Sequence, residues 1–163
     1  MPLDDIDRQI LVLLSEDSRR SQRALARELG MSAPAVGGRV ERLERLGVIR
    51  GYGVRIDWGA AGYPMTVYLS IRTVRGFQQR ETADQIAQMP EVEWLSVVTG
   101  GVDMIARLRI RDHNHLRHVL VDRLWKVEGL QRTETSLTIV EREPRNLVAA
   151  LLTEPAESPE AAG

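Results

Sequence analysis

The hydrophobic periodicity of the chain changes once along its length, and that change limits the folds available to it. In the first third, apolar residues recur every three or four positions, as at Ile6, Ile10 and Leu13, which is the pattern of amphipathic helices. From Val48 onward, apolar and polar residues mostly alternate, as in half-buried strands. A chain of 163 residues can hold one ordinary domain or two small ones. We therefore expect an α+β protein with a helical N-terminal domain.

Capping residues indicate three helices within the first fifty residues. Asp4 is placed to cap the first helix, and Asp7 lies favourably in its first turn, near the positive end of the helix dipole. Ser21 and Gly30 are suited to begin and end a second helix, and Ser32 to begin a third. The segment "VIRGYGVRI" then predicts a strand, a glycine turn and another strand. This order is that of a winged helix-turn-helix.

The third helix has a buried stripe and an outward face, which separate its two glycines. At about 100° per residue, Val36, Val40 and Leu43 fall within an arc of roughly 60°. Gly38 lies opposite this stripe, whereas Gly37 lies on the flank. Because a recognition helix enters the major groove by its N-terminal half, a glycine there lets the backbone approach the bases closely. The alternative is that the glycine pair only weakens or bends an exposed helix.

The predicted DNA interface combines the start of this helix with arginines further along it and in the wing. Arg39 could instead pack its stem on the core, and Arg50, like Arg55, could lie on a solvated strand face. The residues that we predict to contact DNA are Ser32, Ala33, Pro34, Ala35, Gly38, Arg39, Arg42, Arg45 and Arg50.

Charge and composition narrow the class of protein. Between Arg19 and Arg55 there are nine arginines but three acids, although the whole chain has a net charge of −1. Such a basic block is a candidate polyanion footprint, although a solvated helix face gives similar counts. The absence of cysteine excludes disulfides, thiolate metal sites and thiol catalysis. The start of the chain does not resemble a signal peptide, and no apolar run is long enough to span a bilayer, so we expect a cytoplasmic protein without a membrane partner.

The region from Pro64 to Glu141 predicts a second domain. Its pattern runs strand, helix, strand, strand, helix, strand, with Gly100 and Gly101 in the tight turn between the second and third strands. This is the ferredoxin-like βαββαβ order, in which two right-handed crossovers place both helices on one face of an antiparallel sheet.

Four regions follow from these patterns. We expect a winged helix-turn-helix domain at 1–50, a wing and linker strand at 51–63, and a ferredoxin-like ligand-binding and oligomerisation domain at 64–142. The last region, 143–163, is a tail with a short helix over Leu147 to Leu152 and a disordered end rich in Pro, Glu and Ala.

The N-terminal motifs closely resemble those that open the Lrp/AsnC, or feast/famine, family of transcriptional regulators. The matching motifs are the "LDDIDRQIL" start, "LGMS" at the turn and "RVERLERLGVI" leading into the wing, and "VVTGGVD" is similar to the family's turn between the second and third strands. The resemblance covers about residues 3 to 142. It implies binding to double-stranded DNA, dimerisation through the sheets, often assembly into an octamer, and a small effector, usually an amino acid, bound between dimers. No cofactor is implied.

The resemblance also locates an effector site. It implies binding at the turn after the second strand and against the last strand, that is at Thr99, Gly100, Gly101, Val102, Asp103, Thr133 and Thr135. Amides of a glycine turn can hold a carboxylate, and Asp103 could take an ammonium group. Many members have an acid where this chain has Gly101, which implies a different effector, weak binding or none. The glycines also suit the hairpin, and the threonines also suit a strand.

Two other functions compete with a regulator. His113, His115 and His118 crowd the start of a helix, but Asp112 there is better explained as a cap, and we expect neither a metal site nor catalytic residues. Siroheme decarboxylases share the Lrp/AsnC-like fold, and Arg107, Arg109 and His118 could loosely supply a tetrapyrrole pocket. An effector-binding module with a vestigial DNA domain is the third possibility.

Overall fold

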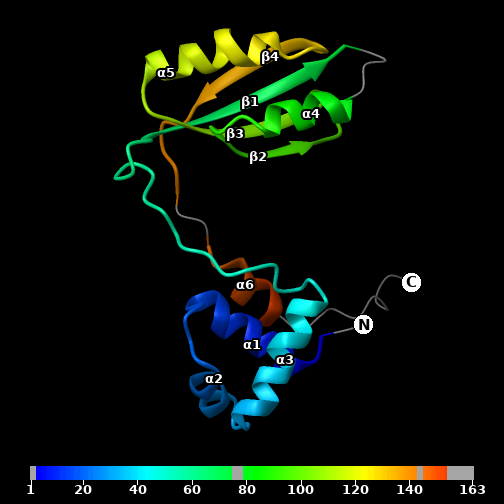
Figure 1. The fold of residues 1–163 in the computed structure, drawn as a ribbon, viewed down its shortest axis with the longest axis vertical. Coiled ribbons are helices and arrows are strands. Elements are labelled where there is room, and N and C mark those ends of the chain that lie inside the picture. Colours follow the sequence, from blue (N-terminus) through cyan, green and yellow to red (C-terminus); the bar gives the residue numbers. More distant parts are fainter. Residues whose placement is uncertain (1–2, 75–78, 143–144, 154–163) are drawn as a thin grey trace, which may run out of the picture. The chain divides into compact units, whose positions relative to one another are not determined.

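The computed structural model describes residues 3–74, 79–142 and 145–153, and the chain divides into two compact units (Figure 1). The first contains the residues up to Val54 together with those from Arg142 onward, and the second spans Arg55–Glu141. The C-terminal segment therefore belongs to the helical unit. The disordered end that we expect for the tail lies outside the described residues.

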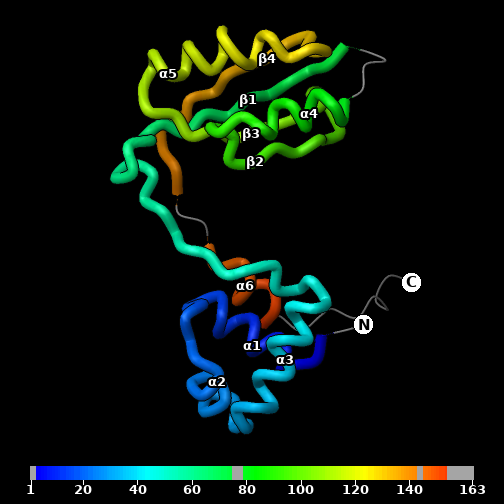
Figure 2. Tube along the Cα trace, viewed as in Figure 1, coloured from blue at the N-terminus to red at the C-terminus, as the bar shows by residue number. Residues whose placement is uncertain are grey.

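The described residues of the first unit form four helices. They are α1 (Asp5–Glu16), α2 (Gln22–Leu29), α3 (Ala33–Arg45) and α6 (Leu147–Thr153). The predicted caps are confirmed: side chains of Asp4, Ser21 and Ser32 accept hydrogen bonds from backbone amides three residues on, at 2.8, 3.2 and 3.3 Å. Gly30 ends α2 in the left-handed conformation with φ +64°. The turn between α2 and α3 is short, as Figure 2 shows.

The core of the first unit joins one face of each of the first three helices. Ile10 of α1, Leu25 of α2 and Val36 of α3 are buried, and Val40 and Leu43 complete the predicted stripe of α3. Helix α6 lies against α1, where Asn146 Nδ2 donates to Ser15 Oγ at 2.9 Å. The short C-terminal helix expected from the sequence is thus present.

The predicted wing does not form as a pair of strands. The segment 48–56 has no strand in the structure; Ile49 packs against the helical core, whereas Val54 is 84% exposed. The predicted arms are only about three residues long, and Gly51 and Gly53 weaken strand pairing. An isolated two-stranded hairpin is marginal even with better arms, so the residues of this segment form no strand ladder in the described chain.

The second unit has the predicted βαββαβ order. Its elements are β1 (Met65–Thr73), α4 (Gln79–Ala87), β2 (Val92–Val97), β3 (Met104–Ile110), α5 (His113–His118), a π-helical turn η1 (Val119–Arg123), a 3-10 turn η2 (Leu124–Lys126) and β4 (Leu130–Leu137). The strands form an antiparallel sheet in the order β2-β3-β1-β4. The ferredoxin-like topology is confirmed.

One face of this sheet is covered and the other is open. The alternating residues Val67, Leu69 and Ile71 of β1 are fully buried in one cluster with Ile86 of α4 and Leu116 of α5. Both helices therefore pack on the same face. The residues between them on β1, including Arg72, face the opposite side, where the described part of the chain provides no covering helix. None of the helices described is long and apolar enough to cross a membrane.

Candidate DNA-reading helix and effector turn

The outward face of α3 is built largely from small residues. Pro34, Ala35 and Gly38 are exposed, whereas Ala33 is partly buried against the core. Apart from its chain neighbours and the backbone of α3 itself, no described atom lies within 4 Å of the position that a Cβ would take at Gly38. The Ser32 hydroxyl is engaged as the cap of the helix. The backbone of this half of α3 is therefore open to a close approach by a partner.

Gly37 has a different surrounding from Gly38. It is buried, and a Cβ at this position would lie 2.8 Å from Oε1 and 3.1 Å from Cδ of Gln22 on α2. A side chain here would have to displace the end of the flexible Gln22 side chain. The two adjacent glycines thus serve different purposes: Gly37 accommodates α2, and Gly38 leaves the outer surface bare.

Two of the predicted DNA-contacting arginines are held by carboxylates of the first helix. Arg39 Nη1 donates to Asp4 Oδ2 at 2.6 Å and to Asp7 Oδ1 at 2.9 Å, and Arg42 Nη2 donates to Asp7 Oδ2. The Asp7 side chain is 1% exposed, while those of Arg39 and Arg42 are 29% and 23% exposed. These pairs tie α3 to the start of α1.

The ionised state of Asp7 depends on both guanidinium groups. Burial alone would raise the pKa of Asp7, but the hydrogen bonds from Arg42 and Arg39 outweigh it, and the pKa lies below its ordinary value. The hydrogen bond from Arg39 likewise lowers the pKa of Asp4. Asp7 is therefore a structural carboxylate, in addition to its predicted place in the first turn of the helix.

Arg45 and Arg50 remain available for an anionic partner. Both are exposed, and neither has an ion pair within the described residues. Nearby, Tyr52 Oη donates to Glu44 Oε1 at 2.8 Å, and burial together with this bond raises the pKa of Tyr52 to about 12. Glu44 is thus engaged by Tyr52 and does not neutralise Arg45.

The predicted effector turn connects β2 to β3, and the carboxylate of its Asp103 forms hydrogen bonds within the chain. The Asp103 carboxylate accepts hydrogen bonds from the Thr73 amide at 2.7 Å, the Thr73 hydroxyl at 3.1 Å and Gln79 Nε2 at 3.3 Å. The Asp103 amide donates to the Ile71 carbonyl at 2.9 Å. Asp103 therefore anchors the turn to the end of β1.

The other predicted effector residues divide between the turn and the last strand. Thr99, Gly100 and Gly101 are exposed, and Val102 is partly buried. Gly100 has φ +121°, a conformation that favours glycine, whereas Gly101 does not have a positive φ. On β4, Thr133 and Thr135 pair with Ile71 and Leu69, so they share the helix-covered side of the sheet. Arg72, on the open side, lies beside this turn, with its Nη2 3.9 Å from the position that a Cβ would take at Gly101.

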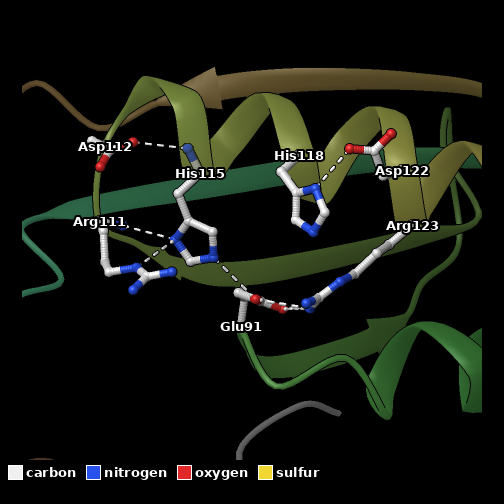
Figure 3. A network of polar contacts seen from close by, with 7 residues as sticks. All are labelled: Glu91, Arg111, Asp112, His115, His118, Asp122 and Arg123. Atoms are coloured by element: carbon white, nitrogen blue, oxygen red, sulfur yellow. Dashed lines mark hydrogen bonds and ion pairs between the residues drawn. The ribbon is translucent and has the colours of Figure 1, made fainter.

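Two of the three histidines after β3, His115 and His118, are used in contacts within the chain (Figure 3). His115 Nδ1 accepts from the Arg111 amide at 3.2 Å, and its Nε2 lies 3.0 Å from Oε1 of Glu91. Arg123 Nη1 donates to both oxygens of that carboxylate, at 2.9 and 2.8 Å. Burial would raise the pKa of Glu91, but the bond from His115 and the charge of Arg123 bring it below its ordinary value.

The residues suggested for metal or tetrapyrrole binding are not brought together. No group of three His, Cys, Asp or Glu side chains in the described ranges is placed to hold a metal ion. His118 Nδ1 lies 2.6 Å from Asp122 Oδ2, and both side chains are exposed. Arg107 and Arg109 lie on the open sheet face, where Glu93 and Glu141 pair with them. No observation favours the decarboxylase-like alternative.

The sequence interpretation missed the pairing partners of these sites. Asp7 lies three residues before the buried Ile10, so it falls on the apolar side of α1, and a carboxylate there needs a cationic partner. The three-residue spacing between Asp7 and Ile10 is therefore a sequence signal for a buried carboxylate with a cationic partner. For Arg72 no such signal exists, because its neighbours come from a turn and a strand that only the folded sheet brings together.

Together these features define a class of protein. The helical unit presents a helix with a bare N-terminal half and arginines without an ion pair in the described chain, and the βαββαβ unit presents an exposed glycine turn. This combination describes a DNA-binding regulator with a ligand-binding domain.

Comparison with known proteins identifies the family. Residues 3–44 match the AsnC-type helix-turn-helix domain, and residues 66–147 match the Lrp/AsnC ligand-binding domain. An HTH-type transcriptional regulator of Pyrococcus abyssi is 36% identical over 135 residues, covering 83% of this chain and 85% of its own length. AldR of Mycolicibacterium smegmatis is 36% identical over 138 residues, covering 83% and 80%. The chain belongs to the Lrp/AsnC family of transcriptional regulators.

Solved structures share the fold. AsnC of Escherichia coli is 23% identical with a TM-score of 0.83, covering 89% of this chain and 97% of its own. A transcriptional regulator of Neisseria meningitidis, solved in complex with L-Met, is 24% identical with a TM-score of 0.82, covering 88% and 94%. At these identities the likeness concerns the fold.

Proposed function

We propose that this regulator reads double-stranded DNA with the N-terminal half of α3 and holds phosphates with Arg45 and Arg50. The observation that carries this proposal is the pairing pattern of the arginines. Arg39 and Arg42 are engaged by Asp7, whereas Arg45 and Arg50 are exposed and unpaired within the described residues. Ala35 and Gly38 leave the backbone open toward the bases. Phosphate contacts position such a helix, and base contacts give its specificity.

The proposal assigns Arg39 and Arg42 a shared role. Their carboxylate partners fix the angle between α1 and α3, and the part of each guanidinium that stays exposed adds to the positive potential of the interface. The Ser32 side chain caps the start of α3. The N-terminal end of this helix, with Ala33 and Pro34, faces the DNA.

We further propose a homodimer, in which two recognition helices meet half-sites separated by about one helical turn of DNA or a multiple of it. The family implies dimerisation through the open sheet face, where Trp94 is 37% exposed, and assembly of dimers into an octamer. As a DNA-binding regulator the protein would act in the cytoplasm. Sedimentation velocity with the full chain tests the assembly, and a monomer at micromolar concentration would contradict it.

The effector component of the proposal concerns the β2–β3 turn. A small molecule bound at Thr99 to Asp103 and near Thr133 and Thr135 would change the assembly and so the spacing of the recognition helices. This requires a different affinity of the effector for the two assembly states. The neighbouring structure with L-Met supports an amino acid or a related compound as the effector.

Salt dependence of DNA binding is the decisive experiment. Fluorescence anisotropy with a duplex from upstream of the protein's own gene should show affinity falling by roughly 0.9 log unit per log unit of salt for each phosphate neutralised. R45Q and R50Q should each reduce that slope by about one unit. R117Q, an exposed arginine on α5 without an ion pair in the described chain, is the matched control and should leave it unchanged. A flat salt response of the wild type would instead support a vestigial DNA domain.

A further inference from the structure

The helical unit contains a cavity that the proposed DNA interface does not use. It has a volume of about 430 Å³ and lies between α1, α2 and the end of α6. Asn146, just before α6, contacts Ser15 near the end of α1. Leu152 and Thr153, at the end of α6, line the cavity together with Asp5 from the start of α1. Because sites for small molecules usually have volumes of roughly 300–1,000 Å³, this cavity is large enough for one.

The wall of the cavity is mostly apolar. Val12 and Leu13 come from α1, Leu29 from α2 and Leu152 from α6. Each of these four side chains is only partly buried, so each keeps apolar surface that contacts water. Removing such surface from water is favourable. An apolar group of a ligand would therefore gain free energy by entering this space.

A guanidinium group without a partner in the described chain borders this apolar wall. Arg8 lines the cavity and is partly buried, and its Nε is buried without a hydrogen-bond acceptor among the described residues. A buried polar atom of a charged group that makes no hydrogen bond is costly. A carboxylate can accept hydrogen bonds from Nε and Nη of one arginine together. Arg8 is therefore suited to bind a carboxylate group.

An acid lies one helical turn before this arginine. Asp5 and Arg8 are three residues apart on α1, so their Cβ atoms are roughly 5–6 Å apart on one face of the helix. Both line the cavity, but no ion pair joins them, and Asp5 has no other cationic partner within the described ranges. Glu28, a further acid of the lining, is paired with Arg20 at 2.8 Å. The cavity thus presents one cation and one anion that a ligand can contact together.

These charges distinguish between classes of ligand. A simple carboxylate would pair with Arg8 but would be repelled by Asp5 and Glu28. A simple amine would pair with Asp5 but would be repelled by Arg8. Since like charges brought together in a binding site cost free energy, a zwitterion fits this lining better than an ion of either sign.

We propose that this cavity is a second ligand site, which binds an α-amino acid with an apolar side chain. The carboxylate of the ligand binds Arg8, its ammonium group binds Asp5, and its side chain contacts Val12 and Leu152. The site lies wholly within the helical unit, so it goes beyond the effector binding proposed for the β2–β3 turn and does not depend on it. Because a ligand that binds only the folded state stabilises it, the unit that carries the recognition helix gains stability.

Methyl NMR of the full chain, labelled with carbon-13 on leucine and valine, locates the bound ligand. L-leucine or L-phenylalanine should shift the methyl signals of Val12, Leu13, Leu29 and Leu152. Shifts confined to the region of the β2–β3 turn, as at Val102, would place the amino acid at the site of the proposed function and would overturn this inference. The absence of any shift with both compounds would overturn it as well.

The same methyl signals measure the affinity at this site for matched analogues. 4-Methylpentanoate and 3-phenylpropanoate lack the ammonium group of the two amino acids, and 3-methylbutylamine and 2-phenylethylamine lack the carboxylate. Each analogue should bind at least about fivefold more weakly than its amino acid, because one charge contact is lost and a repulsive one is left. An analogue that binds as tightly as its amino acid would contradict the charge contact assigned to the missing group.

Two substitutions remove the charge contacts one at a time. R8Q should weaken amino acid binding by about tenfold, because a charge-assisted hydrogen bond is lost. D5N should weaken it by about threefold, since Asp5 is exposed and water screens its charge. R23Q, which removes an exposed arginine of α2 outside the cavity, is the matched control and should bind like wild type.

Circular dichroism at 222 nm checks that each variant is folded, and the analogue series needs no variant. Wild-type affinity in folded R8Q or folded D5N would overturn the inference. DNA binding of the wild-type chain reports the proposed function separately, since it requires neither side chain.

Discussion

Arg42 on α3 donates a hydrogen bond to the carboxylate of Asp7 on α1, whose side chain is only 1% exposed. Arg39 donates to the same carboxylate and to Asp4. A helix proposed to read DNA is thus fixed by charges on its inner flank to a helix that lies outside the helix-turn-helix motif itself. The angle of α3 depends on a buried acid as well as on the apolar stripe of Val36, Val40 and Leu43.

Replacing Asp7 with asparagine should destabilise the helical unit by about 1–3 kcal/mol, since two charge-assisted hydrogen bonds lose their ionised acceptor. The arginine side chains are partly exposed and can turn to water, which keeps the loss within this range. Urea unfolding followed by circular dichroism at 222 nm measures the change. D5N, at an exposed position in the same turn, is the control and should stay within about 0.5 kcal/mol of wild type. Equal stability of D7N and wild type would show that the pair contributes nothing.

The same carboxylate predicts a dependence of stability on acid pH. The pKa of Asp7 is lower in the folded protein than its ordinary value of 3.8, so folding favours the ionised form. Its contribution is complete above pH 3.8 and is lost as the pH falls below that value toward the folded pKa. The difference in unfolding free energy between wild type and D7N should therefore shrink from pH 6 to pH 3. If this difference in unfolding free energy stays constant from pH 6 to pH 3, the charge of Asp7 does not cause the stability difference between wild type and D7N.

Periodicity and capping predicted the elements of this protein well because both are local. Asp4, Ser21 and Ser32 act through amides three residues away, and the alternation of β1 is a property of one strand. The wing shows the limit of this approach. Alternation at Val54 predicts a strand face, but a strand needs a partner, and the described chain provides none for this segment.

The candidate sites were predicted less completely, since they depend on contacts between distant residues. The position of Gly38 on the outer face of α3 followed from helix geometry and is confirmed, whereas the burial of Gly37 against Gln22 required the neighbouring helix. Similarly, the hydrogen bonds from Thr73 and Gln79 to the Asp103 carboxylate could not be read from the sequence, because the folded sheet brings these residues together. Side-chain pairing across elements is not encoded in the spacing of either partner.

The two glycines of α3 should respond differently to alanine. Alanine in a helix interior is favoured over glycine by about 0.5–1 kcal/mol, and at Gly38 the new methyl group meets no atom within 4 Å. G38A should therefore gain this stability in urea unfolding. G37A places its methyl group 2.8 Å from Gln22 Oε1, and displacing that side chain should remove part or all of the gain. Equal stabilisation by both substitutions would contradict the role given to Gly37.

A larger side chain at Gly38 separates stability from DNA binding. G38L adds a helix-favouring residue in open space, so circular dichroism and oligomeric state should be unchanged. If the backbone of α3 approaches the bases at this point, the leucine side chain must hold it away, and specific affinity should fall by roughly ten- to hundredfold, the value of about one base contact. Q85L, on the exposed side of α4 in the other unit, introduces the same side chain as a control and should bind DNA normally. Wild-type affinity in G38L would mean that the first turns of α3 do not lie close to the bases, and that the arginines alone carry the interaction.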